Sequence, residues 1–239
     1  MNEIILLIIE LILCLSMITI IYKQYKLEGM YVYSIASIIL SCTMSLKTIT
    51  IYDYDINLGI IPFVSVFIVS NIIIQKISFE ETKKHLLVTI AATIFSYLVI
   101  ILVSKISPSN IGLFTNASYD NIYSNSLRFI FANIVTLLYS LIINNKLYYY
   151  LKRMKNNILI SNLFSTIIIQ FISTILFSLI AYVFIKEPID IIKIIMVRYL
   201  MSLVVGTIGT VSIYITKYIP YQTLHFYGKK CLKYKINYI

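Results

Sequence analysis

Apolar segments of membrane-spanning length recur along the whole chain, separated by short polar connections. An apolar run of about 20 residues, folded as a helix, crosses a hydrocarbon layer of ~30 Å. We therefore expect an all-α integral membrane protein with seven transmembrane helices, the first of them a retained helix rather than a cleaved signal peptide. The predicted helices span Ile4–Tyr22, Met30–Ile51, Leu58–Gln75, Leu86–Ser104, Leu127–Leu147, Ile158–Ile185 and Ile191–Ile215.

The composition supports a membrane solvent. Hydrophobic residues make up 59% of the 239 positions and charged residues 13%, whereas soluble domains carry about 25% charged residues. The chain has too few polar side chains to cover a water-facing globule, so its expected surroundings are the lipid bilayer. The net charge of +10 fits lysines at cytoplasmic helix ends better than a nucleic-acid partner.

Lysine and arginine residues concentrate in alternate connections between the predicted helices. Fourteen follow the first, third, fifth and seventh helices, and three lie in the other connections. We expect a multi-pass protein of a bacterial inner membrane, and the positive-inside rule predicts that its N-terminus lies outside and its C-terminus, the basic tail 220–239, in the cytoplasm. Lys76–His85 is a charged turn in which Ser78 caps the next helix. Ser107–Ser126 is the longest external connection, either a lid or a passive loop.

Patterns typical of catalysis, metal binding or cofactor binding do not occur in the sequence. Cys14, Cys42 and Cys231 lack metal-ligand spacing, and the two histidines are His85 and His225. There is no glycine-rich phosphate loop and no nucleophile paired with a base. We therefore expect neither an enzyme nor a metal or cofactor site.

Polar side chains inside the predicted helices are the candidates for function, because they are costly in lipid and usually face a bundle interior or a cavity. Lys47, Arg128 and Arg198 lie near outer helix ends, where they either extend to the headgroups or line a polar cavity that opens outward. The amide and hydroxyl candidates are Asn71 and Gln75 on the third helix, Asn133, Ser140 and Asn144 on the fifth, and Ser165, Thr166, Gln170, Ser173 and Thr174 on the sixth.

Two explanations fit these amides and hydroxyls. Side-chain hydrogen bonds of this kind often hold membrane helices together. Their presence on three helices also fits a shared pocket, since an amide both donates and accepts hydrogen bonds. A pocket of this type suits the edge of a planar heterocycle.

The segment RFIFANIVTLLYSLIINNKLYYYLKR, residues 128–153, has an arginine, an alanine four residues on, a serine eight further and a Leu-Lys-Arg ending. This spacing resembles the fifth-helix region of the queuosine precursor transporter family, also called the vitamin uptake transporter family. The Ser-Thr, Gln and Thr positions of 165–174 and the proline-containing helix of 62–75 are similar to neighbouring family motifs. The family usually carries acidic residues at four positions that are neutral here, namely Asn71, Gln75, Asn144 and Ser173.

The resemblance implies six core helices, at 27–219, arranged like the substrate-binding subunits of energy-coupling-factor transporters, with residues 1–26 as an added helix. It implies uptake of a small planar solute, most simply a 7-deazaguanine queuosine precursor or queuine-like base. A non-transporting regulatory, immunity or scaffold protein descended from the family is the alternative, and an energising partner or a homodimer is left open. The implied substrate-binding residues are Asn71, Gln75, Arg128, Asn144, Ser165, Thr166, Gln170, Ser173 and Thr174.

Overall fold

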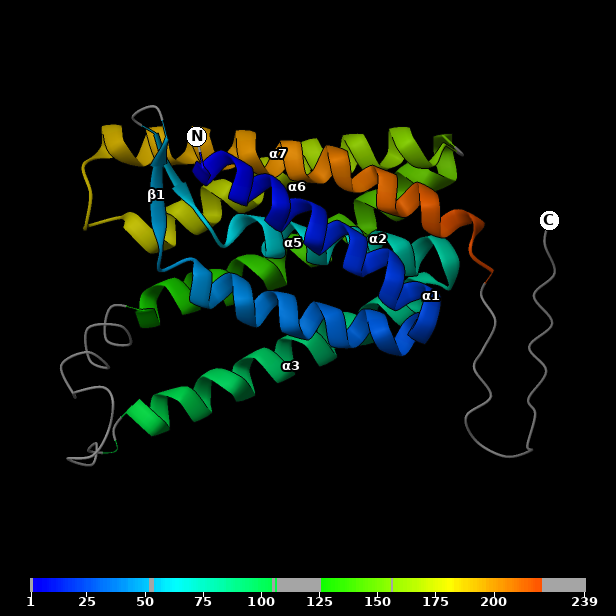
Figure 1. Ribbon diagram of the computed structural model, residues 1–239, viewed down its shortest axis with the longest axis horizontal. Helices are drawn as coiled ribbons and strands as arrows, with labels where there is room; N and C mark the ends of the chain where they lie inside the picture. Colours follow the sequence, from blue (N-terminus) through cyan, green and yellow to red (C-terminus); the bar gives the residue numbers. More distant parts are fainter. Residues whose placement is uncertain (1, 52–53, 105, 107–125, 156, 221–239) are drawn as a thin grey trace.

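The computed structural model describes residues 2–51, 54–104, 106, 126–155 and 157–220, and this part of the chain is a bundle of long helices with one small hairpin (Figure 1). The chain is an all-α integral membrane protein, as predicted. The predicted loop 107–125 and the tail 221–239 lie outside the described residues. The elements are α1 (Asn2–Met44), β1 (Thr48–Ile51), β2 (Tyr54–Asn57), α2 (Ile60–Lys76), α3 (Phe79–Ser104), α5 (Ser126–Lys155), α6 (Ile158–Tyr182) and α7 (Pro188–Tyr218).

Helix α1 bends sharply at Lys26, whose φ of 52° and ψ of −126° are not helical. Its two arms, residues 2–25 and 27–44, run in opposite directions, so α1 supplies the first two predicted passes (Figure 1). Gly29 sits beside this bend, where an added Cβ would lie 2.5 Å from Cγ2 of Ile21. The bend coincides with the predicted division between residues 26 and 27, although the division into domains stays a prediction.

The second predicted helix was extended too far. It ends at Met44, and Thr48–Ile51 forms strand β1, which pairs antiparallel with β2 in the register Thr48 to Asn57. The segment from 48 to 57 alternates polar and apolar residues and is rich in β-branched side chains, a pattern that favours a strand over a helix. Lys47, expected inside a helix, is therefore an exposed residue of the connecting turn.

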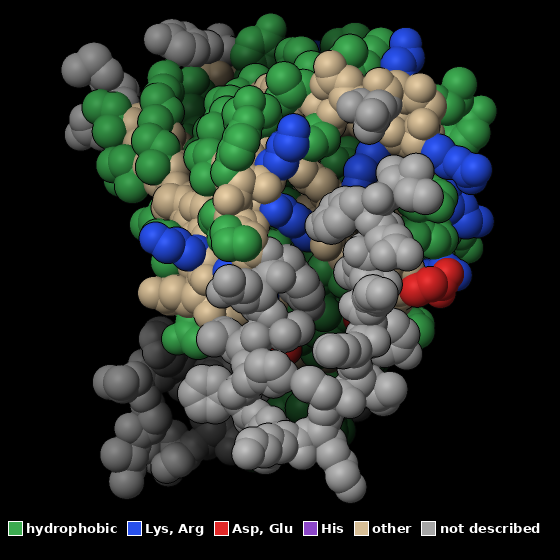
Figure 2. Space-filling model, turned by 90° about the vertical axis from the view of Figure 1, so that its right-hand side faces the viewer, with side chains coloured by type: hydrophobic (Ala, Val, Ile, Leu, Met, Phe, Trp, Pro, Cys, Tyr) green, Lys and Arg blue, Asp and Glu red, His purple; other side chains and the backbone are tan. Residues whose placement is uncertain are grey.

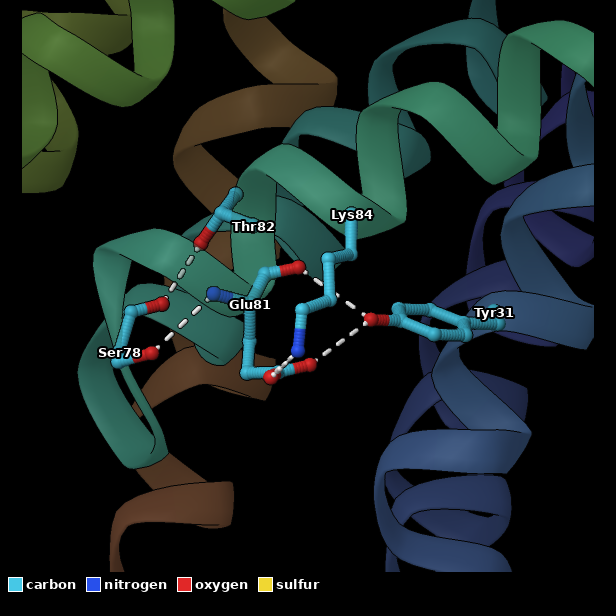
Figure 3. Close-up of polar contacts among 5 residues, drawn as sticks. All are labelled: Tyr31, Ser78, Glu81, Thr82 and Lys84. Carbon is cyan, nitrogen blue, oxygen red and sulfur yellow. Dashed lines mark hydrogen bonds and ion pairs between the residues drawn. The ribbon is translucent and has the colours of Figure 1, made fainter.

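Helix α3 begins seven residues earlier than predicted, because the charged segment forms its first turns (Figure 3). The Ser78 hydroxyl accepts a hydrogen bond of 3.1 Å from the backbone N–H of Glu81, which confirms the predicted cap. The Tyr31 hydroxyl, from the second arm of α1, donates to the Glu81 carboxylate at 3.2 Å. The start of α3 is thus anchored to α1, and its acidic side chains lie at the favourable end of the helix dipole.

The outer surface of the bundle is apolar, as a lipid-facing surface requires. Five of the described helices are long and apolar enough to cross a membrane, and α2 is a shorter apolar helix of 17 residues. Side chains such as Phe95 and Leu200, 68% and 62% exposed, point away from the bundle. Helix α2 is instead buried from Ile60 to Ile74. Because most of α2 is apolar and almost all of it is buried, it forms the centre of the core.

Basic side chains gather at the end of the bundle where α1 bends, opposite the hairpin (Figure 2). Lys76 donates to the backbone carbonyls of Lys217 and Ile219 at 2.7 and 2.9 Å, and Lys26 donates to that of Pro220 at 3.1 Å. The lysine-rich connections predicted from the sequence therefore meet at one end. We refer to it below as the basic end.

Candidate functional site

A cavity of about 460 Å³ lies between the hairpin and the adjoining ends of four helices. The hairpin, α2, α5, α6 and α7 each contribute to its wall, so five separate segments of the chain meet there. We call this cavity the chamber. Its lining residues are Ser45, Leu46, Thr48, Asp55, Asn57, Ile60, Phe129, Tyr182, Lys186, Ile194 and Arg198.

Arg198, on α7, is the buried charge of the chamber. Only 5% of the residue is exposed, and its guanidinium carbon lies 3.7 Å from the ring centre of Phe177 and 5.8 Å from that of Phe63. Its Nη1 has no hydrogen-bond partner among the described residues. A buried donor left unpaired is costly, so this nitrogen is available to an acceptor that enters the chamber. Of the two explanations considered for Arg198, the structure supports the cavity, because Arg198 lies on its wall; that the cavity opens outward stays a prediction.

Aromatic rings flank the arginine. The Phe129 ring, from α5, meets the Tyr182 ring, from α6, edge to face at 5.4 Å between centres. Phe177 contacts both, at 6.4 Å from Phe129 and 6.3 Å from Tyr182. The chamber therefore places flat apolar surfaces next to a planar cation, an arrangement that suits a planar ligand with hydrogen-bond acceptors.

The hairpin is held over the chamber by side-chain to backbone hydrogen bonds. Asn57 donates to the Ser45 carbonyl at 2.8 Å and accepts from the Gly59 N–H at 2.9 Å. Ser41 donates to the Gly59 carbonyl at 2.8 Å. Gly59 is required by space, because a Cβ there would lie 2.3 Å from the Ser41 carbonyl oxygen. These contacts position Asp55 on the chamber wall that also includes Lys186.

Three of the amides on the predicted helices meet in the middle of the bundle and form a chain across four helices. Asn144 (α5) donates to Asn71 (α2) at 2.9 Å, and Asn71 donates to Asn162 (α6) at 2.8 Å. Asn162 in turn donates to the Thr210 hydroxyl (α7) at 2.7 Å. All four side chains are buried. The structure thus brings together Asn71 and Asn144 from the predicted set, in a cluster separate from the chamber lining.

The other predicted residues on α6 bond within their own helix. Ser173 donates to the carbonyl and the side-chain oxygen of Gln170 at 3.1 and 3.2 Å, and Thr174 donates to the Gln170 carbonyl at 2.6 Å. Ser165 donates to the Asn162 carbonyl at 3.0 Å. Thr166 packs against Gly206, where an added Cβ would lie 2.4 Å from its Cγ2. None of these side chains is among the residues that line the chamber.

Arg128 and Gln75 occupy different surroundings again. Arg128 donates from Nε to the Ile180 carbonyl at 2.7 Å and from a terminal nitrogen to the Val183 carbonyl. It thereby satisfies free carbonyls at the C-terminal end of α6 and ties α5 to it. Gln75 lies at the basic end of α2, and its Oε1 has no partner among the described residues.

Sequence reasoning missed several residues that the structure places at these sites. Asn162 lies four residues before Thr166 on the same face of α6, so helical spacing was a sufficient signal for it. Phe129 and Tyr182 carry no signal in an aromatic-rich membrane chain, and the contribution of Asn57 depends on the hairpin. In the described part of the chain, no group of three or more histidine, cysteine or acidic side chains is placed to hold a metal ion.

Comparison with known families identifies the chain. A family model described as "Putative vitamin uptake transporter" matches residues 57–216, which include four of the five segments that build the chamber wall and the whole amide chain. No curated protein and no solved structure matches the chain. Because the model covers more than half of the 239 residues, the chain belongs to the vitamin uptake transporter family.

Proposed function

We propose that this protein takes up a small planar solute, a 7-deazaguanine queuosine precursor or queuine-like base, across a bacterial inner membrane. The chamber is its first binding position. The observation that carries the proposal is the buried Arg198, whose Nη1 has no partner among the described residues and which lies within a cavity wall that also holds aromatic rings. The solute class is the expectation raised by the resemblance, and the chamber's chemistry supports it.

The chamber matches such a base in size and in chemistry. Its volume of about 460 Å³ lies within the range of about 300–1,000 Å³ usual for small-molecule sites. A guanine-type base presents a carbonyl acceptor on its edge, which a planar guanidinium binds well. Phe129 and Tyr182 supply apolar surface for the ring faces. Asp55, on the hairpin side of the wall, is an acceptor for ring N–H or amine groups.

Uptake requires that the chamber face the outside, and the charge distribution supports this orientation. The chamber lies at the hairpin end of the bundle, and the basic end is opposite the hairpin (Figures 1 and 2). The positive-inside rule places the basic end in the cytoplasm. The amide chain lies between the two ends, so the predicted substrate residues Asn71 and Asn144 serve a step after the first binding event.

The decisive experiment is uptake of labelled queuine by cells of a transport-deficient host that express the chain. We expect uptake above that of the empty host, and stabilisation of the purified protein by queuine in thermal unfolding, since a ligand of the folded state stabilises it. Arg153→Met, at the exposed basic end, is the control substitution. Stabilisation without uptake favours the non-transporting alternative. If no deazaguanine produces either uptake or stabilisation, the proposal is refuted.

A further inference from the structure

One face of α5 carries a continuous row of buried polar side chains. The residues follow one another at intervals of three or four positions, so they lie on a single face of the helix. All are at most 1% exposed. We call this row the polar seam, and it consists of Asn133, Thr136, Ser140, Asn144 and Tyr148.

Every member of the polar seam keeps a polar atom that has no hydrogen-bond partner among the described residues. These atoms are Oδ1 of Asn133, Oγ1 of Thr136, Oγ of Ser140, Oδ1 of Asn144 and the hydroxyl of Tyr148. Polar atoms buried without partners are rare in folded proteins, and each one is costly inside a membrane. A role in holding the helices together accounts only for the hydrogen bonds that are formed, such as that from Asn144 to Asn71. Five unpartnered atoms in a row need a different explanation.

The polar seam connects the chamber with the basic end. At one end, Asn133 donates to the hydroxyl of Ser45, a residue of the chamber wall, at 3.5 Å. At the other end, Lys152 follows Tyr148 by one helical turn and donates to the Gln75 carbonyl at 3.2 Å. The distance from residue 133 to residue 152 along the helix is about 28 Å at 1.5 Å per residue. This length matches the hydrocarbon layer of a bilayer.

We propose that the polar seam is the hydrated route along which the solute leaves the chamber and crosses the membrane, an inference that rests on the proposed function. Water molecules, and then the edge of the solute, take up the hydrogen bonds that the five side chains do not make. The side chains are packed together in this structure, so passage uses a second conformation that admits water, as a carrier requires. Amides and hydroxyls bind a polar uncharged solute without holding it as tightly as a charge would.

Thiol labelling tests the hydration of the polar seam without any solute. Ser140→Cys and Thr136→Cys are made in a chain whose native cysteines are replaced by serine, and a water-soluble maleimide is applied to the membranes. Tyr139→Cys is the control, because Tyr139 lies beside Ser140 at the same depth but is 57% exposed on the outer face. Thiols react as thiolates, which form in water and not in lipid. We expect both seam variants to be labelled about tenfold faster than the control; equal or slower labelling of both overturns the proposal.

Transport by valine variants then tests whether the solute uses this route. Thr136→Val and Ser140→Val remove one hydroxyl each, and Tyr139→Val is the control. We expect queuine to stabilise all three proteins as it does the unaltered chain, while uptake by the two seam variants falls about tenfold or more. Normal uptake by both, even with labelled thiols, refutes the route. If no deazaguanine binds, the proposed function fails, but the labelling result still decides whether the polar seam is hydrated. If the polar seam is not labelled, the route is refuted and the proposal for the chamber still stands.

Discussion

Replacing Arg198 by methionine separates a ligand-binding arginine from a structural one. The guanidinium is buried against Phe177, with one terminal nitrogen unpartnered among the described residues. An unpaired buried donor costs about 1–3 kcal/mol, and the contact of the cation with the ring returns about 2 kcal/mol when desolvated. Methionine has a similar length and keeps a sulfur–aromatic contact of about 1 kcal/mol. We therefore expect the free energy of unfolding of Arg198→Met to equal that of the unaltered chain or to exceed it by up to about 2 kcal/mol.

The same substitution should abolish the stabilisation that queuine gives the unaltered chain. At a solute concentration of 100 times its dissociation constant, binding stabilises the folded state by about 2.7 kcal/mol. For a chain of this size that corresponds to a rise in Tm of about 5–11 °C. The assay is thermal unfolding of the purified protein in detergent, with and without queuine. Arg198→Met should unfold at the same temperature with queuine as without it.

The opposite pattern would refute this reasoning. A structural arginine is one whose buried charge is paired, and its removal typically destabilises a protein by about 3–5 kcal/mol. If Arg198→Met loses that much stability while queuine still raises its Tm, the arginine is structural and the chamber does not bind through it. Arg153→Met removes an exposed arginine at the basic end, and it should leave both the stability and the response to queuine unchanged.

Three further predictions concern the packing that supports the fold and these sites. Asn162→Leu breaks the amide chain at its centre and should lower the free energy of unfolding by about 1–3 kcal/mol, measured by denaturation in mixed micelles. Gly59→Ala places a Cβ 2.3 Å from the Ser41 carbonyl oxygen, so it should destabilise the protein by about 1–3 kcal/mol and weaken queuine binding. Gly206→Ala should lower the free energy of unfolding by less, because its Cβ is crowded only by the side-chain methyl of Thr166. Ser78→Ala should cost about 1 kcal/mol and speed hydrogen exchange in the first turn of α3, whereas Ser78→Asp should restore both.

Two of the positions at which the resemblance leads us to expect acids, Asn71 and Asn144, carry amides that contact each other. Asn144 and Asn71 hydrogen-bond directly at 2.9 Å. Two carboxylates at this distance do not both ionise, so an acidic pair here would hold a proton between them. The amides satisfy each other without a proton, and their interaction does not depend on pH near neutrality.

The sequence by itself determined where the long apolar helices lie along the chain, although the predicted bounds of several were wrong. The length of each apolar run sets how much of the chain lies in lipid, and the alternating lysines meet at one end of the bundle (Figure 2). The cap at Ser78 was likewise predictable, since a helix start depends on residues within one turn of it. These features are local, so the order of residues along the chain is enough to predict them.

The hairpin, the chamber and the partners of the polar residues were decided by tertiary structure. The second helix was predicted to continue to Ile51, although residues 48–57 alternate polar and apolar positions; the docking of Asn57 against the Ser45 carbonyl determines where the strands lie. Arg198 borders a chamber because distant helix ends meet the hairpin there. Asn71 bonds to Asn144, 73 positions away, whereas Gln170 bonds to Ser173 three positions on. Periodicity predicts which residues share a helix face, but packing between helices determines which faces meet.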